Sequence, residues 1–332
     1  MRRHESMSTR EITFGRAVAE AIQEEMARDE NVIVIGEDCW RALEEDPMHP
    51  KYARKPHPRI FNTPISEAGF TGAAAGAAMM GLRPVLYFLM GMFMLSGFDQ
   101  AVNQIPKLRY LSGGQAKLPI VIYTANGTGM RYAAQHAWSL HPIFANIPGF
   151  KIVLPSTPYD AKGLMKTAIR DDNPVLFLSH FLLEGMKGNV PEGDYTIDFG
   201  KADIKRPGKD VTLVAISAMV DKALRAARRL ERQGIDVEVL DPRTILPLDK
   251  EAIFGSVEKT GHLVIVDDAH KTCSFASEIS ATITEEKFNC LKAPPKRVAM
   301  ADVPVPFSPI LEDEIVPTER KIVDAVKSVL NR

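Results

Sequence analysis

Residues 61–72 read Phe61-Asn62-Thr63-Pro64-Ile65-Ser66-Glu67-Ala68-Gly69-Phe70-Thr71-Gly72. Pro64 restricts the residue before it to an extended backbone, and Ser66 is a suitable N-cap, so a helix is expected to begin here. Glu67 then lies at the positive end of the helix dipole. Its carboxylate is suited to hold one fixed hydrogen-bond donor, although an acid in a first helical turn is also common as a simple complement to the dipole, worth about 0.3–1 kcal/mol. Gly and Ala fill positions 72–78, so another segment is able to pack very close to this helix.

Around this stretch, apolar runs typical of buried strands alternate with helical patterns. In the first half, the expected strands are 32–36, 84–89, 118–124, 151–154 and 175–178, and the expected helices are 13–28, 66–80, 96–111 and 158–170. In the second half, the expected strands are 211–216, 237–240 and 263–266, and the expected helices are 220–232, 278–288 and 319–330. Buried strands that alternate with helices predict parallel sheets covered on both faces. We therefore expect an α/β protein with two doubly wound, mainly parallel-sheet domains.

Glycine and proline are frequent between residues 184 and 209, where hydrophobic periodicity is weak, and this is typical of a linker. The pattern predicts a first domain at 1–184, a linker at 185–209 and a second domain at 210–332. The prolines between 294 and 309 predict a stiff segment that runs along the surface.

Bulk composition narrows the function classes. The 332 residues are 45% hydrophobic and 25% charged with a net charge of −1, which is ordinary for a soluble protein and gives no electrostatic case for binding nucleic acid or an anionic membrane. The densest apolar run, 85–95, is about half the length that a membrane span needs. The three cysteines, Cys39, Cys273 and Cys290, are scattered and form no CxxC pair, so we expect reduced thiols in the cytoplasm.

Several motifs occur in an order and spacing that are specific together. They are Asn62–Phe70, Gly81–Pro84, Phe98–Gln100, Ser112–Gly114, Gln135-His136 and Pro155–Leu164. On these motifs the chain resembles the β subunits of the thiamine-diphosphate-dependent 2-oxoacid dehydrogenases, from about Ile12 to the C-terminus. Three later segments look closest to the acetoin and branched-chain types: Asp267–His270, Phe275–Ser280 and Val303–Asp313. The resemblance implies a transketolase-like pyrimidine-binding domain followed by a domain like the transketolase C-terminal domain.

The resemblance assigns roles to Glu67, His136 and Phe93. It implies that the Glu67 carboxylate hydrogen-bonds the aminopyrimidine of thiamine diphosphate and shifts it to the imino form, after which the cofactor carries the chemistry. It places His136 near the substrate and the lipoyl acceptor, and Phe93 against the pyrimidine. From the residues alone, a histidine beside Trp138 is more often structural, and an aromatic ring among methionines equally fits a core. His141 has no counterpart in the family pattern and is expected to be structural.

The resemblance also bears on ions and partners. It matches Ile120, Ala168, Asp171 and Asn173 to positions whose oxygens hold a structural potassium ion in several relatives, while 171–174 equally reads as a plain turn. The sequence has no Gly-Asp-Gly signature for a diphosphate-bound metal. An α subunit is therefore expected to hold the diphosphate and its Mg²⁺, in an α2β2 heterotetramer with the active site at a subunit interface. A lipoyl acyltransferase component is a further expected partner.

Four segments depart from the family pattern. The loop 39–59 lacks the usual glycines, Tyr87 stands where relatives often carry an acid, residues 90–94 are rich in methionine, and Ala137-Trp138 replaces the usual Ser-Gln. These changes leave the substrate open between 2-oxoacids and acetoin. Two other functions compete with an acyl-transferring dehydrogenase: a catalytically idle assembly subunit, and a transketolase-like enzyme that cleaves C–C bonds. The missing diphosphate motif disfavours the second.

Overall fold

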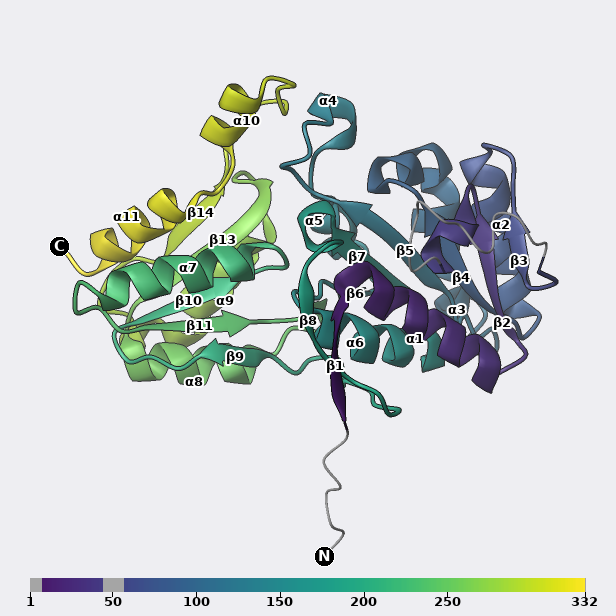
Figure 1. Ribbon diagram of the computed structural model, residues 1–332, viewed down its shortest axis with the longest axis horizontal. Helices are drawn as coiled ribbons and strands as arrows, with labels where there is room; N and C mark the ends of the chain where they lie inside the picture. Colours follow the sequence, from purple (N-terminus) through teal and green to yellow (C-terminus); the bar gives the residue numbers. More distant parts are fainter. Residues whose placement is uncertain (1–7, 44–56, 332) are drawn as a thin grey trace, which may run out of the picture. The chain divides into compact units, whose positions relative to one another are not determined.

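The computed structural model describes residues 8–43 and 57–331, which form two compact units (Figure 1). The chain passes between the units more than once. The first unit comprises Met1–Thr124, Thr157–Phe177 and Leu183–Asp198. The second comprises Ala125–Ser156, Leu178–Leu182 and Phe199–Arg332. This division assigns segments 125–156 and 178–182 to the second unit, whereas the sequence pattern led us to place them in a first domain at 1–184; those domain ranges stay a prediction.

A parallel sheet forms the centre of the first unit. Strand β2 (Val32–Gly36) pairs in parallel with β3 (Ile60–Asn62) and β4 (Arg83–Phe88), and β4 pairs in parallel with β5 (Val121–Asn126). Strand β7 (Val175–His180) is the neighbour of β5 on its other side. Every residue of β2 and β7 is buried, which explains the apolar sequences of β2 and of residues 175–178 of β7, because both faces of a parallel sheet are covered.

Helices α1 (Phe14–Arg28), α2 (Glu67–Met79) and α6 (Pro158–Arg170) belong to this unit. The sequence predicted α6 best: Thr157 accepts a hydrogen bond from the Asp160 amide at 3.1 Å, and Pro158 occupies the first turn. Helix α6 packs on α1 through buried ion pairs. Lys162 Nζ lies 2.6 Å from a Glu20 oxygen and 2.8 Å from a Glu24 oxygen, although the lysine is fully buried.

The expected helix at 96–111 is helical over much of its length but is not one continuous α-helix. The segment instead forms a 3-10 helix, η2 (Gly91–Gly97), a π-helical turn, η3 (Gln100–Gln104), and a short helix, α3 (Leu108–Leu111). Pro106 lacks the N–H that a continuous helix needs. At Gly97 the backbone approaches the start of α2 so closely that a Cβ would lie 3.0 Å from the Glu67 carbonyl oxygen.

The expected linker at 185–209 contains two strands. Strand β8 (Lys187–Pro191) pairs antiparallel with β1 (Thr9–Thr13) in the first unit. Strand β9 (Asp203–Arg206) pairs antiparallel with β11 (Val237–Asp241) in the second. Both strands are polar and only partly buried, so they carry no apolar pattern that sequence reasoning could use.

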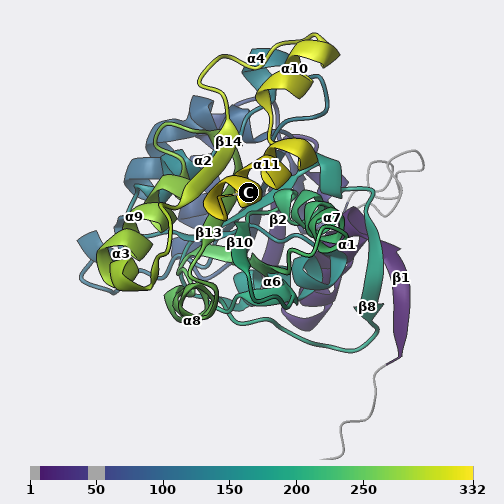
Figure 2. The same ribbon diagram turned by 90° about the vertical axis from the view of Figure 1, so that its left-hand side faces the viewer.

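The second unit has a five-stranded sheet in the order β14-β13-β10-β11-β9. Strand β10 (Val211–Ala215) pairs in parallel with β11 and with β13 (Leu263–His270), and β13 pairs in parallel with β14 (Lys296–Met300). Figure 2 shows α7 (Met219–Glu231) and α11 (Glu319–Val329) on one face of this sheet and α8 (Lys250–Thr260) and α9 (Phe275–Lys287) on the other. The α/β class with mainly parallel sheets is therefore confirmed.

Shorter elements complete the second unit. They are β6 (Lys151–Val153), antiparallel to β12 (Thr244–Leu246), and the helices α4 (Ala133–His136), α5 (His141–Ala145) and α10 (Pro309–Ile315). Both β14 and α10 lie in or next to the proline-containing segment, 294–309, that we expected to run along the surface as a stiff segment. Three further 3-10 turns are η1 (Cys39–Leu43), η4 (Phe181–Leu183) and η5 (Phe288–Cys290). Among the described helices, none combines the length and the apolar character that crossing a membrane requires.

Candidate active site

Glu67 is the first residue of α2, and its side chain is half-buried. Ser66 holds the N-cap position, but its side chain makes no cap hydrogen bond; its Oγ instead donates to the Pro64 carbonyl at 3.4 Å. Within residues 8–43 and 57–331, the Glu67 carboxylate has no hydrogen bond and no ion pair. A carboxylate at the positive end of a helix dipole with open acceptor positions is able to bind a ligand N–H.

The segment that covers the start of α2 is η2, which carries Phe93. Its neighbours Met92 and Met94 are buried, whereas Phe93 is only half-buried. The methionines therefore fill the core, whereas Phe93 remains half-buried.

Glu37 is a neighbour of Glu67 that sequence reasoning did not single out. It follows β2 directly, at the carboxyl end of a parallel strand, where such sheets display functional groups. Burial, together with the negative charges of Asp38 and Glu67, raises the pKa of Glu37 above its ordinary value. The signal was present in the Gly36-Glu37-Asp38 sequence, but the coupling between Glu37 and Glu67 arises only in the fold.

Tyr87, one of the departures from the family pattern, is buried on β4. Its ring lies 5.6 Å from that of Tyr123, and burial raises the pKa of its phenol further above the usual range. The negative charges of Glu184 and Asp38 act on it in the same direction. An uncharged side chain at this position therefore avoids a further carboxylate in an acidic, buried neighbourhood.

His136, the second expected catalytic residue, belongs to the other unit. It is the last residue of α4 and is half-buried. The residues after it, which replace the usual Ser-Gln, have a packing role: Ala137 is fully buried in a cluster with Met300, Val305 and Val316, and Trp138 packs against that cluster. His141 is also buried, with Nε2 3.0 Å from Asp267 Oδ1, which agrees with a structural role.

The four residues matched to a potassium site belong to the first unit, and one of them, Asp171, contacts Arg83. The Ile120 carbonyl accepts from the Val175 amide at 2.9 Å, and the Ala168 carbonyl accepts from the Asp171 amide at 3.3 Å. The Asp171 carbonyl accepts from Arg83 Nη1 at 3.1 Å, and its side chain accepts from the Asn173 amide at 2.8 Å. The set offers carbonyl and side-chain oxygens, the ligand type that hard cations take, and the Asp171 carbonyl among them already accepts from a guanidinium.

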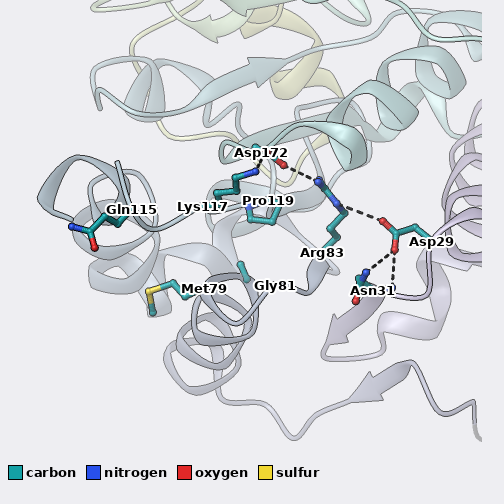
Figure 3. Close-up of a pocket in the computed structure, with 10 residues that line it drawn as sticks. Asp29, Asn31, Met79, Gly81, Arg83, Gln115, Lys117, Pro119 and Asp172 are labelled. Carbon is teal, nitrogen blue, oxygen red and sulfur yellow. Dashed lines mark hydrogen bonds and ion pairs between the residues drawn. The ribbon is translucent and has the colours of Figure 1, made fainter. Parts of the chain in front are cut away.

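A cavity of about 450 Å³ adjoins this region (Figure 3). It is lined by Asp29, Asn31, Ala78, Met79, Gly81, Arg83, Gln115, Lys117, Pro119 and Asp172. Arg83 Nη2 and Lys117 Nζ each lie 2.7 Å from an Asp172 oxygen, so the polar groups of the wall are largely paired with one another. Helix α2 contributes Ala78 and Met79 from its end to the wall of this cavity, and nothing from its start. None of the residues expected to act in catalysis lines the cavity. In the part of the chain that is described, no group of three or more His, Cys, Asp or Glu side chains is arranged to hold a metal ion.

Comparison with known proteins agrees with the two-part architecture. The sequence matches the transketolase pyrimidine-binding domain over residues 10–182 and the transketolase C-terminal domain over residues 200–322. It is 46% identical over 334 residues to the β subunit of acetoin:2,6-dichlorophenolindophenol oxidoreductase of Bacillus subtilis (strain 168), with 97% of this chain and 98% of that protein covered. It is 43% identical over 320 residues to the pyruvate dehydrogenase E1 component subunit β of Rickettsia felis, with 96% and 98% covered.

The fold also matches a solved structure. A split-gene transketolase, described as an inactive β4 tetramer, superimposes with a TM-score of 0.78 at 25% identity, covering 96% of this chain and 98% of that chain. Relatives at this identity over nearly the full length confirm the resemblance that the motifs indicated. The chain belongs to the family of thiamine-diphosphate-dependent dehydrogenase β subunits that includes the acetoin and pyruvate enzymes.

Proposed function

We propose that this chain is the β subunit of a heteromeric dehydrogenase component that uses thiamine diphosphate to cleave acetoin or a 2-oxoacid and passes the acyl group to a lipoyl group. The observation that carries this proposal is the 46% identity with an acetoin oxidoreductase β subunit along 97% of the chain. Glu67, on the first turn of α2 with open acceptor positions, supplies the group that this function needs.

Glu67 binds the cofactor by accepting a hydrogen bond at its pyrimidine end, and the half-buried Phe93 ring packs against the pyrimidine. When bound, thiamine diphosphate supplies the electron-accepting chemistry. The pKa of Glu37 is raised by burial, by Asp38 and also by the charge of Glu67, so a ligand N–H at Glu67 offsets part of the repulsion between the two carboxylates. His136 moves a proton at the substrate or at the incoming lipoyl group, as a general acid–base.

A partner is part of this proposal. An α subunit binds the diphosphate and Mg²⁺ in an α2β2 assembly, and Ile120, Ala168, Asp171 and Asn173 hold a potassium ion. The small-residue face of α2 supports a subunit contact, because no described atom lies within 4 Å of where a Cβ at Gly76 would be. The inactivity of the split-gene transketolase β4 tetramer supports a β chain that is inactive in the absence of its partner. We place the protein in the reducing cytoplasm, and we propose that the assembly docks to a lipoyl acyltransferase component.

We place acetoin first among the substrates, because two acetoin oxidoreductase β subunits are 46% and 44% identical to this chain, whereas the pyruvate dehydrogenase β subunits compared with it are 39–43% identical. The test is to purify the chain together with its α subunit and to follow reduction of 2,6-dichlorophenolindophenol with acetoin, pyruvate and a branched 2-oxoacid. Turnover that requires both subunits and thiamine diphosphate supports the function, and the preferred substrate settles the class. No cofactor-dependent turnover with any of the three would support an idle assembly subunit.

A further inference from the structure

The loop that carries His136 has a backbone that needs external support. It runs from β5 to α5, and its two ends meet where the Gly127 amide donates to the Trp138 carbonyl at 3.3 Å. Arg131 and Ala133 have φ of 61° and 60°, in the left-handed region that residues other than glycine rarely adopt. Such conformations persist where surrounding contacts impose them.

One set of contacts comes from α10. Glu312 is fully buried, and its two carboxylate oxygens bind different parts of the loop. Oε1 accepts from the Gly129 amide at 2.6 Å, and Oε2 lies 2.8 Å from Arg131 Nη1. Arg131 Nη2 lies 2.8 Å from an oxygen of Asp313, so the planar guanidinium bridges two neighbouring carboxylates. Figures 1 and 2 both show α10 beside α4.

A second set comes from the end of β13. Asp268, also buried, accepts from the Thr128 amide at 3.0 Å and from Thr128 Oγ1 at 2.8 Å. Its Oδ2 lies 2.9 Å from Nε2 of His180, whose Nδ1 accepts from the Leu182 amide, so Nε2 carries the proton. Burial alone would raise the pKa of Asp268, but these donors hold it at about 2, so the carboxylate stays ionised. Gly127 lies so close to the His180 ring that a Cβ would come within 2.2 Å of it.

The far end of the loop is held by apolar contacts. Ala137, next to His136, is buried against Met300, Val305 and Val316, which flank α10 in the sequence. The segment 300–316 therefore contacts the loop on both sides of α4, through Glu312 before the helix and through the apolar cluster after it. This gives a physical role to Asp267–His270 and Val303–Asp313, two of the segments that the resemblance singled out.

We propose that Glu312 is a positioning residue for His136: its buried carboxylate, with Asp268 as a second anchor, fixes the 127–138 loop in the conformation that presents the imidazole. The proposal rests on the proposed catalytic role of His136. Glu312 does not touch substrate or cofactor; it acts through Gly129 and Arg131. Loss of the carboxylate removes the contacts that hold Gly129 and Arg131, and Arg131 is one of the two loop residues with a left-handed φ.

The test compares Glu312→Gln with a matched control, Glu238→Gln, in the complex of the full chain with its α subunit. Glu238 is an equally buried carboxylate of the same unit that accepts hydrogen bonds from Ser256 and Lys259 and has no contact with the loop. In Gln an NH2 group replaces one of the two carboxylate oxygens, and because this group donates and does not accept, either Gly129 or Arg131 faces a donor where it had an acceptor. We expect Glu312→Gln to lower turnover at least tenfold at unchanged cofactor affinity and to expose the Arg131–Tyr132 bond to trypsin. The control should lose thermal stability but keep turnover and trypsin resistance.

Two further variants keep the outcome decisive. Asp313→Asn changes an exposed side chain, so the chain should fold, and we expect a smaller effect in the same direction. The positioning role is refuted if Glu312→Gln and Asp313→Asn both resist trypsin and keep wild-type turnover. It is also refuted if Glu238→Gln loses as much turnover as Glu312→Gln. If His136→Ala abolishes turnover while Glu312→Gln retains it, only the positioning role fails. If His136→Ala turns over normally, the role of His136 falls and this inference with it, whatever trypsin shows.

Discussion

Replacing Glu67 by Gln should separate a catalytic carboxylate from a helix-capping one. Within the described chain the Glu67 side chain makes no hydrogen bond or ion pair, so the change removes only its charge at the start of α2. Loss of the dipole interaction costs about 0.3–1 kcal/mol of unfolding free energy. Relief of the repulsion from Glu37 acts in the opposite direction. We therefore expect a net stability change below about 1 kcal/mol.

The effect on activity should be much larger. A hydrogen bond to a charged acceptor contributes about 1.5–3 kcal/mol, and 1.4 kcal/mol corresponds to about a factor of ten, so turnover should fall roughly 10- to 200-fold from this contact alone. A further loss follows because an amide cannot favour the imino form of the pyrimidine as a carboxylate does. The fall should therefore exceed that range.

The assay measures denaturant unfolding and cofactor-dependent turnover on the same samples of wild type and variant, with the α subunit present for turnover. Glu319→Gln is the control, because Glu319 is the first residue of α11, just as Glu67 is of α2. The control should show a similar small stability change and full turnover. Wild-type turnover in Glu67→Gln would refute the catalytic assignment and leave Glu67 as a dipole complement.

Three further predictions follow from the site and from the charge network between α1 and α6. The purified chain without its α subunit should bind thiamine diphosphate and Mg²⁺ weakly, because a buried diphosphate needs a paired cation; calorimetry that shows tight stoichiometric binding would contradict a divided site. His136→Ala should lower turnover by roughly 10²–10⁴-fold with cofactor affinity nearly unchanged, measured both with an artificial electron acceptor and by lipoyl transfer. Near-normal rates of His136→Ala in both assays would show that His136 has a structural role. Burial raises the pKa of Glu24, but hydrogen bonds from Lys162 and Lys166 lower it below its ordinary value, and Lys166 also lowers the pKa of Asp194. The stabilisation is therefore present above the unfolded pKa values of these carboxyls and is lost as pH falls through the depressed folded values. Unfolding curves at a series of acidic pH values should show a weaker pH dependence for Lys166→Met than for wild type; equal slopes would refute this.

The elements that the sequence predicted well share a local cause. Strand β2 is a continuous apolar run, and α6 has a capping threonine, a proline in its first turn and a proline beyond its end. The elements that it missed depend on distant partners. Strands β8 and β9 are polar edge strands that exist because β1 and β11 offer them backbone hydrogen bonds. The segment 96–111 carries a helical pattern, but Pro106 and the close contact at Gly97 break it into short turns.

The same distinction applies to the site. Glu67 and His136 were assigned from motifs that lie within a few residues of them. Glu37 was not, because its pKa is raised mainly by burial and then by the charges of Asp38 and Glu67, and both its burial and the proximity of Glu67, thirty positions further along the chain, arise only in the fold. Glu312 was quoted only as part of a motif, because its contacts with Gly129 and Arg131 join segments more than 180 positions apart. Local patterns therefore predict the reacting groups, whereas the residues that we propose to position them can be recognised only from the fold.

Asp268, Glu312 and Glu67 differ in how many hydrogen bonds their carboxylate oxygens accept from the described chain. This difference predicts the role of each carboxylate. Asp268 and Glu312 are buried, and every oxygen accepts from a loop amide, a hydroxyl, an imidazole or a guanidinium. A buried charge with all its partners in place is able to fix a backbone conformation, and it has no acceptor left for a ligand. Glu67 has the opposite character, because it is half-buried, lies beside another acid and has no donor from the described chain. Such a carboxylate contributes little to folding and keeps its acceptor capacity for a molecule that brings its own N–H. The catalytic assignment of Glu67 and the positioning assignment of Glu312 thus follow from one physical criterion, applied in opposite directions.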